Sequence, residues 1–275
     1  MPVPRPLLGG GDVRQLLRTH GLHPSKQRGQ NFVTDPNTVR RIVRDAGVQP
    51  GDVVVEVGPG LGSLTLALLE AGAQVHAIEV DHGLAAALAE VVGPGVTITV
   101  ADALAVSYAE LIGDGPATMI ANLPYNVATP ILMTALREGA LAGYHLMVQR
   151  EVGQRWVASV GDPAYGAVSV KIALLAQARM AGSISRQAFH PIPNVESVTV
   201  SLTPYPHVLH DVVERTIALV DAGFSQRRKM LRNALATSAR RPADIDMWLR
   251  SSDLPRDSRA EELTPQDWTR LAAVQ

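Results

Sequence analysis

The stretch Val53-Val54-Val55-Glu56-Val57-Gly58-Pro59-Gly60-Leu61-Gly62 decides the fold class of this 275-residue chain. Its first five residues form a short, nearly all-apolar run, which is typical of a strand buried on both faces of a sheet. The glycines that follow let the backbone turn sharply and approach a ligand closely. A helical pattern over residues 63–71 comes directly after them. The stretch therefore predicts a strand, a ligand-binding turn and a helix in succession.

The same alternation of strand and helix patterns continues along the chain. We expect further strands at residues 74–80, 96–100, 117–121 and 144–148, and further helices at 12–21, 35–47, 82–91 and 131–137. Short spacings of this kind are typical of a parallel sheet covered by helices on both faces. Residues 197–202 alternate as a late edge strand does, and a strand around residues 178–184 is its expected partner.

The pattern of apolar and polar residues changes after Pro204 and Pro206, because residues 208–275 have helical patterns only. We therefore predict an α/β fold, a Rossmann-like sheet with helices on both faces, followed by a small all-helical domain. The expected boundaries are a flexible N-terminal extension at residues 1–22, a main domain at 23–204 and a helical domain at 205–275.

The composition excludes several classes of protein. Hydrophobic residues make up 46% of the chain and charged residues 19%, which rules out global disorder. The absence of cysteine rules out disulfides, a thiolate nucleophile and a zinc–thiolate site, and we expect no metal. No apolar run reaches the 18 or so residues of a membrane span, and the N-terminus lacks the pattern of a secretory signal. We expect a soluble, cytoplasmic, monomeric protein with no membrane partner.

The net charge of −1 is an average over unlike segments. Residues 1–50 hold 8 Lys/Arg against 3 Asp/Glu, whereas residues 51–150 hold 2 against 10. A polyanionic partner would therefore be bound through local basic patches.

The glycine turn is flanked by two acidic residues, and their positions favour one kind of cofactor over another. Glu56 lies two residues before Gly58, and Glu79 ends the second strand, 17 residues beyond Gly62. A dinucleotide site would need the G-x-G-x-x-G spacing, and an acid at position 56 would repel a pyrophosphate. S-adenosylmethionine instead carries a cationic amino-acid moiety and a ribose, which Glu56 and Glu79 suit. Gly58 and Gly60 would let the backbone approach this cofactor.

Asp102 follows the third strand and is the next candidate for the cofactor site. A carboxylate there can accept a hydrogen bond from the exocyclic amine of an adenine. The alternative is an ordinary helix N-cap.

The tetrapeptide Asn122-Leu123-Pro124-Tyr125 ends the fourth strand, where open sheets place their ligands. An exocyclic amine of a nucleobase is a poor nucleophile until its hydrogens are drawn towards acceptors. The Asn122 side chain and the Leu123 carbonyl can accept them, Pro124 stiffens the turn, and Tyr125 can stack on an extruded base. Phe189 can cover the other face of that base, and ordinary core packing explains Phe189 equally well.

Five sequence blocks in this order resemble the ribosomal RNA adenine dimethyltransferases, and in particular the bacterial enzymes that act on 16S rRNA. The blocks are KQRGQNFVTDP from Lys26, VVEVGPGLGSLT from Val54, IEVD from Ile78, NLPYN from Asn122, and the pair FHPIPNVESVTV from Phe189 with FSQRRKMLRNAL from Phe224. The resemblance spans residues 24–270. It implies the class I methyltransferase fold and S-adenosylmethionine as cofactor. It also implies dimethylation of two adjacent adenines near the 3′ end of 16S rRNA in the 30S subunit, with a role in subunit maturation.

The resemblance also assigns residues. It implies that residues 30–33 fold over the cofactor, with Asn31 and Val33 in contact, and that Gly58, Glu79, Asp102 and Asn122 match further cofactor positions. The basic side chains expected to contact rRNA phosphates are Lys26, Arg28, Arg227, Arg228, Lys229 and Arg232. In this interpretation, the last four open a C-terminal helix; a merely solvated face is the alternative.

Two other functions stay open on the sequence. One is a 23S rRNA adenine methyltransferase of the macrolide-resistance type, which shares the glycine turn and a similar tetrapeptide. The other is a relative that binds RNA or assists ribosome assembly without catalysis, although the turn and the tetrapeptide are both intact here.

Overall fold

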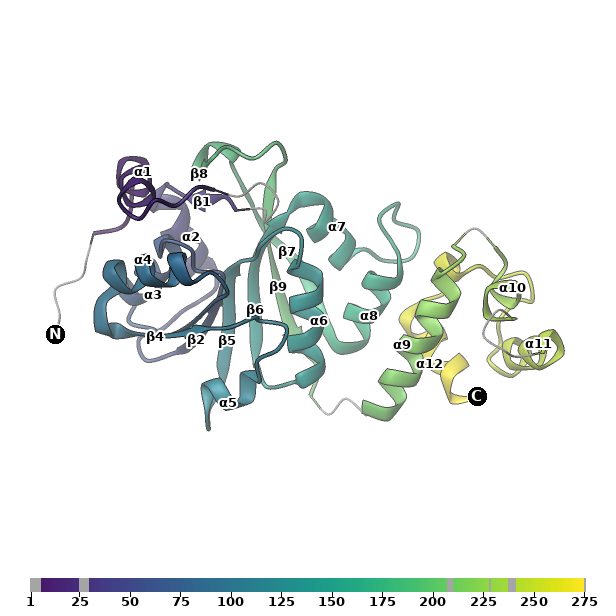
Figure 1. The fold of residues 1–275 in the computed structure, drawn as a ribbon. Helices are drawn as coiled ribbons and strands as arrows, with labels where there is room; N and C mark the ends of the chain where they lie inside the picture. The colour runs from purple at the N-terminus through teal and green to yellow at the C-terminus, as the bar shows by residue number, and fades with distance from the viewer. Residues whose placement is uncertain (1–5, 25–29, 207–209, 228, 237–240, 275) are drawn as a thin grey trace. The chain divides into compact units, whose positions relative to one another are not determined.

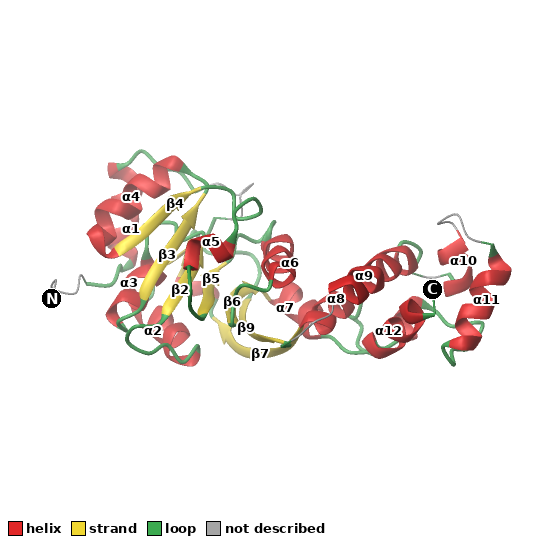
Figure 2. Ribbon diagram, turned by 90° about the horizontal axis from the view of Figure 1, so that it is seen from below, coloured by secondary structure: helices red, strands yellow, loops and turns green. Residues whose placement is uncertain are grey.

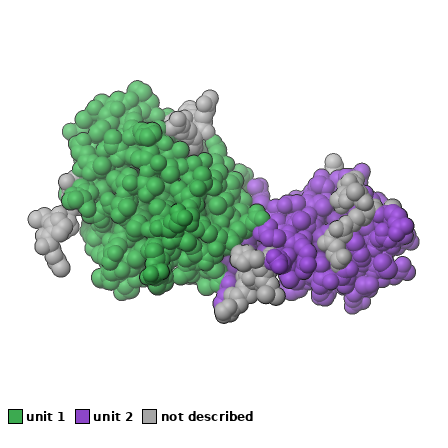
Figure 3. All heavy atoms as spheres, turned by 60° about the horizontal axis from the view of Figure 1, so that its bottom comes forward, with its two compact units in different colours: residues 1–153, 179–204 green, residues 154–178, 205–275 purple. Residues whose placement is uncertain are grey.

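The computed structural model describes residues 6–24, 30–206, 210–227, 229–236 and 241–274. The chain divides into two compact units, residues 1–153 with 179–204 and residues 154–178 with 205–275 (Figure 3). The first unit contains the sheet, and the second consists almost wholly of helices.

In chain order, the first unit contains α1 (Gly10–Thr19), β1 (Phe32–Val33), α2 (Pro36–Asp45), β2 (Val53–Val57), α3 (Ser63–Glu70), β3 (Gln74–Glu79), α4 (His82–Val92), β4 (Val96–Val100), α5 (Tyr108–Ile112), β5 (Ala117–Asn122), α6 (Ala128–Glu138), β6 (Gly143–Gln149), β8 (Phe189–His190) and β9 (Ser197–Pro204). The second contains α8 (Ala167–Leu175), α9 (His210–Phe224), α10 (Leu231–Ala236), α11 (Pro242–Ser251) and α12 (Pro265–Ala273). α7 (Arg150–Val157) and β7 (Ala176–Ile184) each begin in one unit and end in the other. No helix within the described ranges is both long and apolar enough to cross a membrane.

The main sheet has the strand order β4-β3-β2-β5-β6-β9-β7. Neighbouring strands from β4 to β6 are parallel, and β9 is antiparallel to β6. Figure 2 shows the strands between α2, α3 and α4 on one side and α5 and α6 on the other. The predicted Rossmann-like α/β fold is confirmed. The chain builds outward from β2 to β4 and then returns to β5 on the other side of β2, so the strand order reverses between β2 and β5.

One sequence expectation about the sheet was wrong. Residues 197–202 were expected to form an edge strand, but β9 lies between β6 and β7, and β7 forms the edge. The expected pairing of the two strands is confirmed. β9 is buried along most of its length, whereas most of β7 is exposed or half-buried.

Local sequence signals explain where the helices start. Asp35 caps α2, because its carboxylate accepts hydrogen bonds from the N–H groups of Asn37 and Thr38 at 3.3 and 3.1 Å. Pro36 follows at the first helical position, where its missing N–H costs nothing. Val39, Ile42 and Val43 then form the buried face of α2, in the core cluster that also contains Val54 of β2 and Leu68 of α3.

The N-terminal segment differs from the flexible extension expected for residues 1–22. Residues 10–19 form α1, and Val13 and Leu17 on its inner face are buried. They pack in one cluster with Phe32, Leu61 and Leu84. The helix expected at residues 12–21 is therefore present as α1, and the spacing of four residues between Val13 and Leu17 places both side chains on one of its faces.

The second unit begins earlier in the chain than the expected boundary at residue 205. Residues 154–178 belong to it, because Tyr165 and Val170 pack in the same apolar cluster as Leu219, Trp268 and Leu271. The Tyr165 hydroxyl also donates a hydrogen bond to the carbonyl of Leu263 at 2.7 Å. Apolar contacts made by a segment far away in sequence thus complete the helical core.

Leu17→Ala should lower the free energy of unfolding by about 2–3 kcal/mol, since it removes a buried side chain from the cluster under α1. Chemical denaturation of the full chain measures this loss. Gln15→Ala, at an exposed position of the same helix, is the control and should leave the denaturation midpoint unchanged. Overlapping curves for Leu17→Ala and the unmodified protein would show that α1 is not part of the folded core.

Candidate active site

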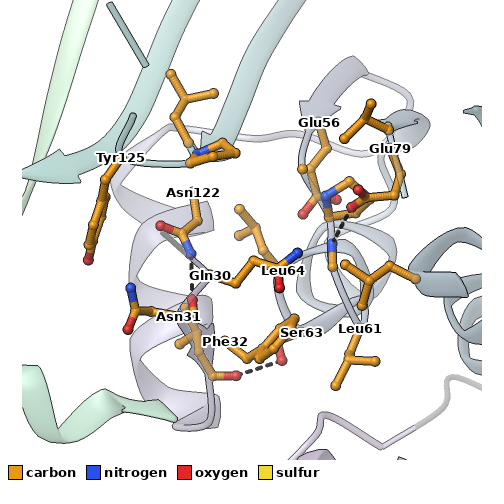
Figure 4. A pocket seen from close by; sticks show the side chains of 18 of the residues that line it. Gln30, Asn31, Phe32, Glu56, Leu61, Ser63, Leu64, Glu79, Asn122 and Tyr125 are labelled. Atoms are coloured by element: carbon orange, nitrogen blue, oxygen red, sulfur yellow. Dashed lines mark hydrogen bonds between the residues drawn. The ribbon is translucent and has the colours of Figure 1, made fainter. Parts of the chain in front are cut away.

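A cavity of about 460 Å³ lies at the carboxyl ends of β2, β3 and β5, where the strand order reverses. Open parallel sheets bind their ligands at such a point, because the loops on either side of the reversal diverge and leave a crevice. The cavity is lined by residues 30–33, 56, 58–61, 63, 64, 79, 80, 84 and 122–127. Figure 4 shows Glu56 and Glu79 at one end of it and Asn122 and Tyr125 towards the other.

The glycine turn between β2 and α3 forms the floor of the cavity. Gly58 and Gly60 have φ angles of 68° and 57°, in the left-handed region that favours glycine. Neighbouring side chains also leave little room for a larger residue at these two positions. A Cβ atom on Gly60 would lie 2.9 Å from a ring carbon of Phe32, and one on Gly58 would lie 3.3 Å from Cδ of Pro124. The turn therefore brings three distant segments together.

Glu79 ends β3 and is almost fully buried. Its Oε2 accepts a hydrogen bond from the N–H of Gly60 at 3.3 Å (Figure 4), and its Oε1 accepts one from the N–H of Asp81 at 3.0 Å. Burial raises the pKa of Glu79, while the two backbone donors act in the opposite direction. The carboxyl group is thus held in place beside the glycine turn.

Glu56 of β2 is the more deeply buried acid of the two. The hydroxyl of Thr65 donates a hydrogen bond to its Oε2 at 2.7 Å. Loss of hydration raises the pKa of Glu56 to about 8, because burial disfavours the charged form, and nearby Glu79 adds to the shift. A cationic group placed beside these carboxyls would favour their ionised forms.

Asn122 ends β5 at the other side of the cavity. Its Nδ2 donates a hydrogen bond to the carbonyl of Asn31 at 3.2 Å (Figure 4), whereas its Oδ1 is buried and accepts none from the residues that the structure describes. A buried amide oxygen without a donor is costly to the fold, by about 1–3 kcal/mol. It is an acceptor available to a ligand.

Tyr125 lies beside this acceptor and is held by its hydroxyl. The Tyr125 hydroxyl and the Ser197 hydroxyl are 3.0 Å apart and share a hydrogen bond. Burial raises the pKa of Tyr125, so the ring is neutral and can stack on a flat apolar or aromatic group.

Most residues predicted for the cofactor and the base line this cavity: Asn31, Val33, Glu56, Gly58, Gly60, Glu79, Asn122, Leu123, Pro124 and Tyr125. Asp102 does not. It is exposed, and its carboxylate accepts a hydrogen bond from the N–H of Leu104 at 2.9 Å. Phe189 does not line the cavity either, because it is buried in the core cluster with Val33 and Ile42.

Sequence reasoning expected residues 30–33 over the cofactor but gave no role to the side chains of Phe32, Ser63 and Val80. Phe32 packs against the glycine turn, and the Ser63 hydroxyl donates a hydrogen bond to the carbonyl of Val33 at 2.6 Å. Val80, directly after Glu79, lines the cavity and is 62% exposed. No local pattern marks Val80, because its exposure is a property of the folded structure.

The residues predicted to contact RNA are only partly described. Lys26, Arg28 and Arg228 lie outside the described residues. Arg227 forms an ion pair with Glu261 at 2.8 Å, and Lys229 is exposed. The helix expected to open with this cluster, α10, begins only at Leu231, so Arg227 and Lys229 lie in the turn before it and Arg232 lies in its first turn.

The whole chain can be compared with known families. A family model described as "Ribosomal RNA adenine dimethylase" matches residues 22–274. The chain belongs to the ribosomal RNA adenine dimethylase family. Two curated relatives are both named "Ribosomal RNA small subunit methyltransferase A". One, from Kineococcus radiotolerans, is 50% identical over 274 residues (97% of this chain, 91% of the relative), and one, from Leifsonia xyli, is 48% identical over 277 residues (97% and 98%).

Solved structures of similar fold agree with this membership. A dimethyladenosine transferase from Plasmodium falciparum has a TM-score of 0.70 at 22% identity, covering 87% of this chain and 95% of that one. The 23S rRNA methyltransferase ErmE has a TM-score of 0.66 at 23% identity, covering 88% and 98%. Such low identities bear on the fold alone. The predicted family, the class I methyltransferase fold and the use of S-adenosylmethionine are confirmed.

The cavity of this ribosomal RNA adenine dimethylase fits its cofactor. Its volume is within the range of small-molecule sites, about 300–1,000 Å³. Two buried carboxyls, Glu56 and Glu79, line the cavity and would suit a ligand that carries an ammonium group and a ribose. Gly58 and Gly60, which have no side chain, let a ligand approach the backbone of the turn closely.

Glu56→Gln should flatten the pH dependence of stability between pH 5 and 8. The folded protein holds the Glu56 proton up to about pH 8, whereas the unfolded chain releases it near pH 4.5, so this group makes stability fall as pH rises through that window. The slope attributable to Glu56 approaches about 1.4 kcal/mol per pH unit. Unfolding free energies of the ligand-free protein at several pH values measure it.

Glu70→Gln is the matched control for this titration. The pKa of Glu70 is lowered by its hydrogen bond from Arg40 on the surface, so its stability contribution changes only in the acid range. Glu70→Gln should therefore leave the slope between pH 5 and 8 intact. Parallel slopes for the unmodified protein and Glu56→Gln would contradict the desolvation of Glu56.

Proposed function

We propose that this rRNA adenine dimethylase transfers methyl groups to N6 of two adjacent adenines near the 3′ end of 16S rRNA in the 30S subunit, with a role in subunit maturation. The observation that carries the proposal is the buried, unpartnered Oδ1 of Asn122 beside Tyr125, at the end of a cavity that fits S-adenosylmethionine. The small-subunit target is supported by the names of the relatives at 42–50% identity.

The cofactor half of the site consists of Asn31, Val33, Glu56, Gly58, Gly60 and Glu79. When bound, S-adenosylmethionine supplies a methyl carbon made electrophilic by its sulfonium. Glu79, oriented by the N–H groups of Gly60 and Asp81, would accept hydrogen bonds from the ribose hydroxyls. Glu56 favours the cationic amino-acid end, and the N–H groups of the glycine turn lie within the crevice.

The base half of the site consists of Asn122, Leu123, Pro124 and Tyr125. Asn122 Oδ1 and the carbonyl of Leu123 accept the two hydrogens of the adenine amine and turn its lone pair out of conjugation. Tyr125 stacks on the extruded base, with its ring fixed by the bond to Ser197. No strong general base is needed, because the nitrogen becomes acidic once it is alkylated and its proton leaves to water. Catalysis acts mainly through positioning and polarisation.

Asp102 and Phe189 remain predictions of the sequence. For Asp102 to reach the adenine of the cofactor, its carboxylate would exchange the Leu104 N–H for the exocyclic amine. Phe189 pairs with Val33 across β1 and β8 and belongs to the same core cluster, so it lies beside a lining residue. For Phe189 to cover the target base, its ring would have to leave the core cluster.

The RNA itself is bound through phosphates by basic side chains, for which Lys26, Arg28, Arg227, Arg228, Lys229 and Arg232 are the candidates. Arg227 and Glu261 form an exposed pair, worth little to stability, so Arg227 can exchange its partner for a phosphate at small cost. We infer that the protein acts as a monomer in the cytoplasm.

Asn122→Ala should lower kcat by about a hundredfold or more, because the amine loses the acceptor that polarises it. The dissociation constant of S-adenosylmethionine should change only by a modest factor. Single-turnover methylation and calorimetric cofactor binding measure the two separately. Asn37→Ala, at an exposed position of α2, is the control. Near-normal turnover of Asn122→Ala would remove this residue from the mechanism.

Labelled methyl transfer tests the target. Under-methylated 30S subunits, 50S subunits and naked 23S rRNA are each incubated with the protein and labelled S-adenosylmethionine. We expect label on 30S subunits only, as N6,N6-dimethyladenosine near the 3′ end of 16S rRNA. Label on 23S rRNA would instead indicate the macrolide-resistance activity, and cofactor binding without any label would indicate a non-catalytic assembly role.

A further inference from the structure

The connection between β8 and β9, residues 191–196, joins two opposite parts of the active-site rim. At its start, His190 pairs with Phe32, which lines the cavity at the cofactor end. At its end, Ser197 bonds to Tyr125, which lines the cavity at the base end. Figure 1 shows this connection as the green loop that leaves β8 beside β1 and returns to the sheet.

Residues 191–196 are fixed at several points besides these two ends. Arg186 donates a hydrogen bond to the carbonyl of Asn194 at 3.3 Å. The N–H of Arg150 donates to the carbonyl of Glu196 at 2.8 Å, and the side chains of Arg150 and Glu196 form an ion pair at 2.6 Å. Pro191 and Pro193 restrict φ within the connection. Its shape is therefore largely set before any partner binds, which lowers the entropy cost of binding.

The connection exposes apolar side chains to water at the rim. Ile192 is 62% exposed and Val195 is 38% exposed, although hydrogen bonds and an ion pair hold the backbone of the connection in place. A single exposed apolar residue is ordinary on a protein surface. Here Ile192 belongs to a restrained segment whose two ends contact Phe32 and Tyr125, which line the cavity.

We propose that residues 191–196 dock on the RNA strand beside the target adenine, with the Ile192 side chain packed against a neighbouring base. This inference rests on the proposed function of the cavity. An adenine that enters the cavity leaves its stack, and the adjoining base then exposes an apolar face. Isoleucine is one of the side chains that proteins place against such unstacked base steps.

The positive charge of Arg186, beside residues 191–196, also suits an RNA strand. The bond from Arg186 goes to a carbonyl, which does not neutralise the guanidinium, and this side chain is exposed. Arg186 is therefore available to a phosphate of the strand that Ile192 contacts. The contact is one of shape and stacking, so it positions the strand rather than reads its sequence.

Ile192→Gln tests the contact kinetically. With under-methylated 30S subunits, KM for the subunit should rise about five- to tenfold, the range expected from loss of one base contact. The kcat and the dissociation constant of S-adenosylmethionine should stay unchanged, because Ile192 does not line the cavity. Met247→Gln is the matched control, since Met247 is 54% exposed on α11 in the second unit and should leave KM unaffected.

The absence of cysteine allows a direct test of what residue 192 touches. Ile192→Cys and Met247→Cys are labelled with benzophenone maleimide and irradiated on 30S subunits. We expect the label at residue 192 to crosslink to 16S rRNA within a few nucleotides of the methylated adenines. Crosslinks from residue 192 mainly to a ribosomal protein, or to a second copy of this chain, would overturn the inference.

Arg186→Gln separates the charge from the apolar contact. It should reduce the dependence of RNA binding on salt by about one ion, whereas Ile192→Gln should leave that dependence unchanged.

If the unmodified protein methylates 30S subunits while Ile192→Gln keeps its KM, the inference fails and the proposed function stands. If the unmodified protein methylates no 30S subunits, the proposed function fails and the inference with it.

Discussion

The glycine turn between β2 and α3 has to fit between a phenylalanine ring and a proline ring, and the active site is arranged around that constraint. A Cβ atom on Gly60 would lie within 2.9 Å of Phe32, and one on Gly58 within 3.3 Å of Pro124. The turn thereby holds the N-terminal segment that carries Asn31 and the segment after β5 that carries Pro124. The Gly60 N–H also orients Glu79. One backbone conformation thus positions side chains from three distant parts of the chain.

Burial of polar groups makes this cavity suited to its ligand and costly to the ligand-free fold. Glu56 and Glu79 both have raised pKa values because they are removed from water, and Asn122 Oδ1 is buried without a donor among the described residues. A cofactor with a cationic end and a base with a hydrogen-bonding amine would satisfy these groups. These buried polar groups lower the stability of the fold, and the hydrogen bonds and charge pairing that they gain when substrates bind contribute to affinity and orientation.

The rim of the site is also built by elements outside the glycine turn and the Asn122–Tyr125 tetrapeptide. α1 packs beneath Phe32, Leu61 and Leu84, so a segment near the N-terminus supports the cofactor end of the cavity. The β8–β9 connection is anchored at Phe32 through His190 and at Tyr125 through Ser197. Both elements couple the stability of the fold to the geometry of the catalytic residues.

The amino-acid sequence determined the features that depend on neighbours in the chain. The apolar run before the glycines, the spacing of Glu56 and Glu79, and the Asn122–Tyr125 tetrapeptide predicted the strands, the cofactor and the chemistry, because each signal is contained within a few residues. β9 was placed at the sheet edge, and residues 154–178 were assigned to the main domain, because alternation and helical patterns do not specify which elements lie side by side.

Only the tertiary structure decided which side chains of remote segments meet. It placed Phe189 in the core, and it brought Ser197 to Tyr125 and Phe32 to Gly60. These outcomes depend on the strand order and on close packing between segments far apart in the sequence. No local pattern of residue types encodes them, since the free energy that selects them comes from the whole packed core.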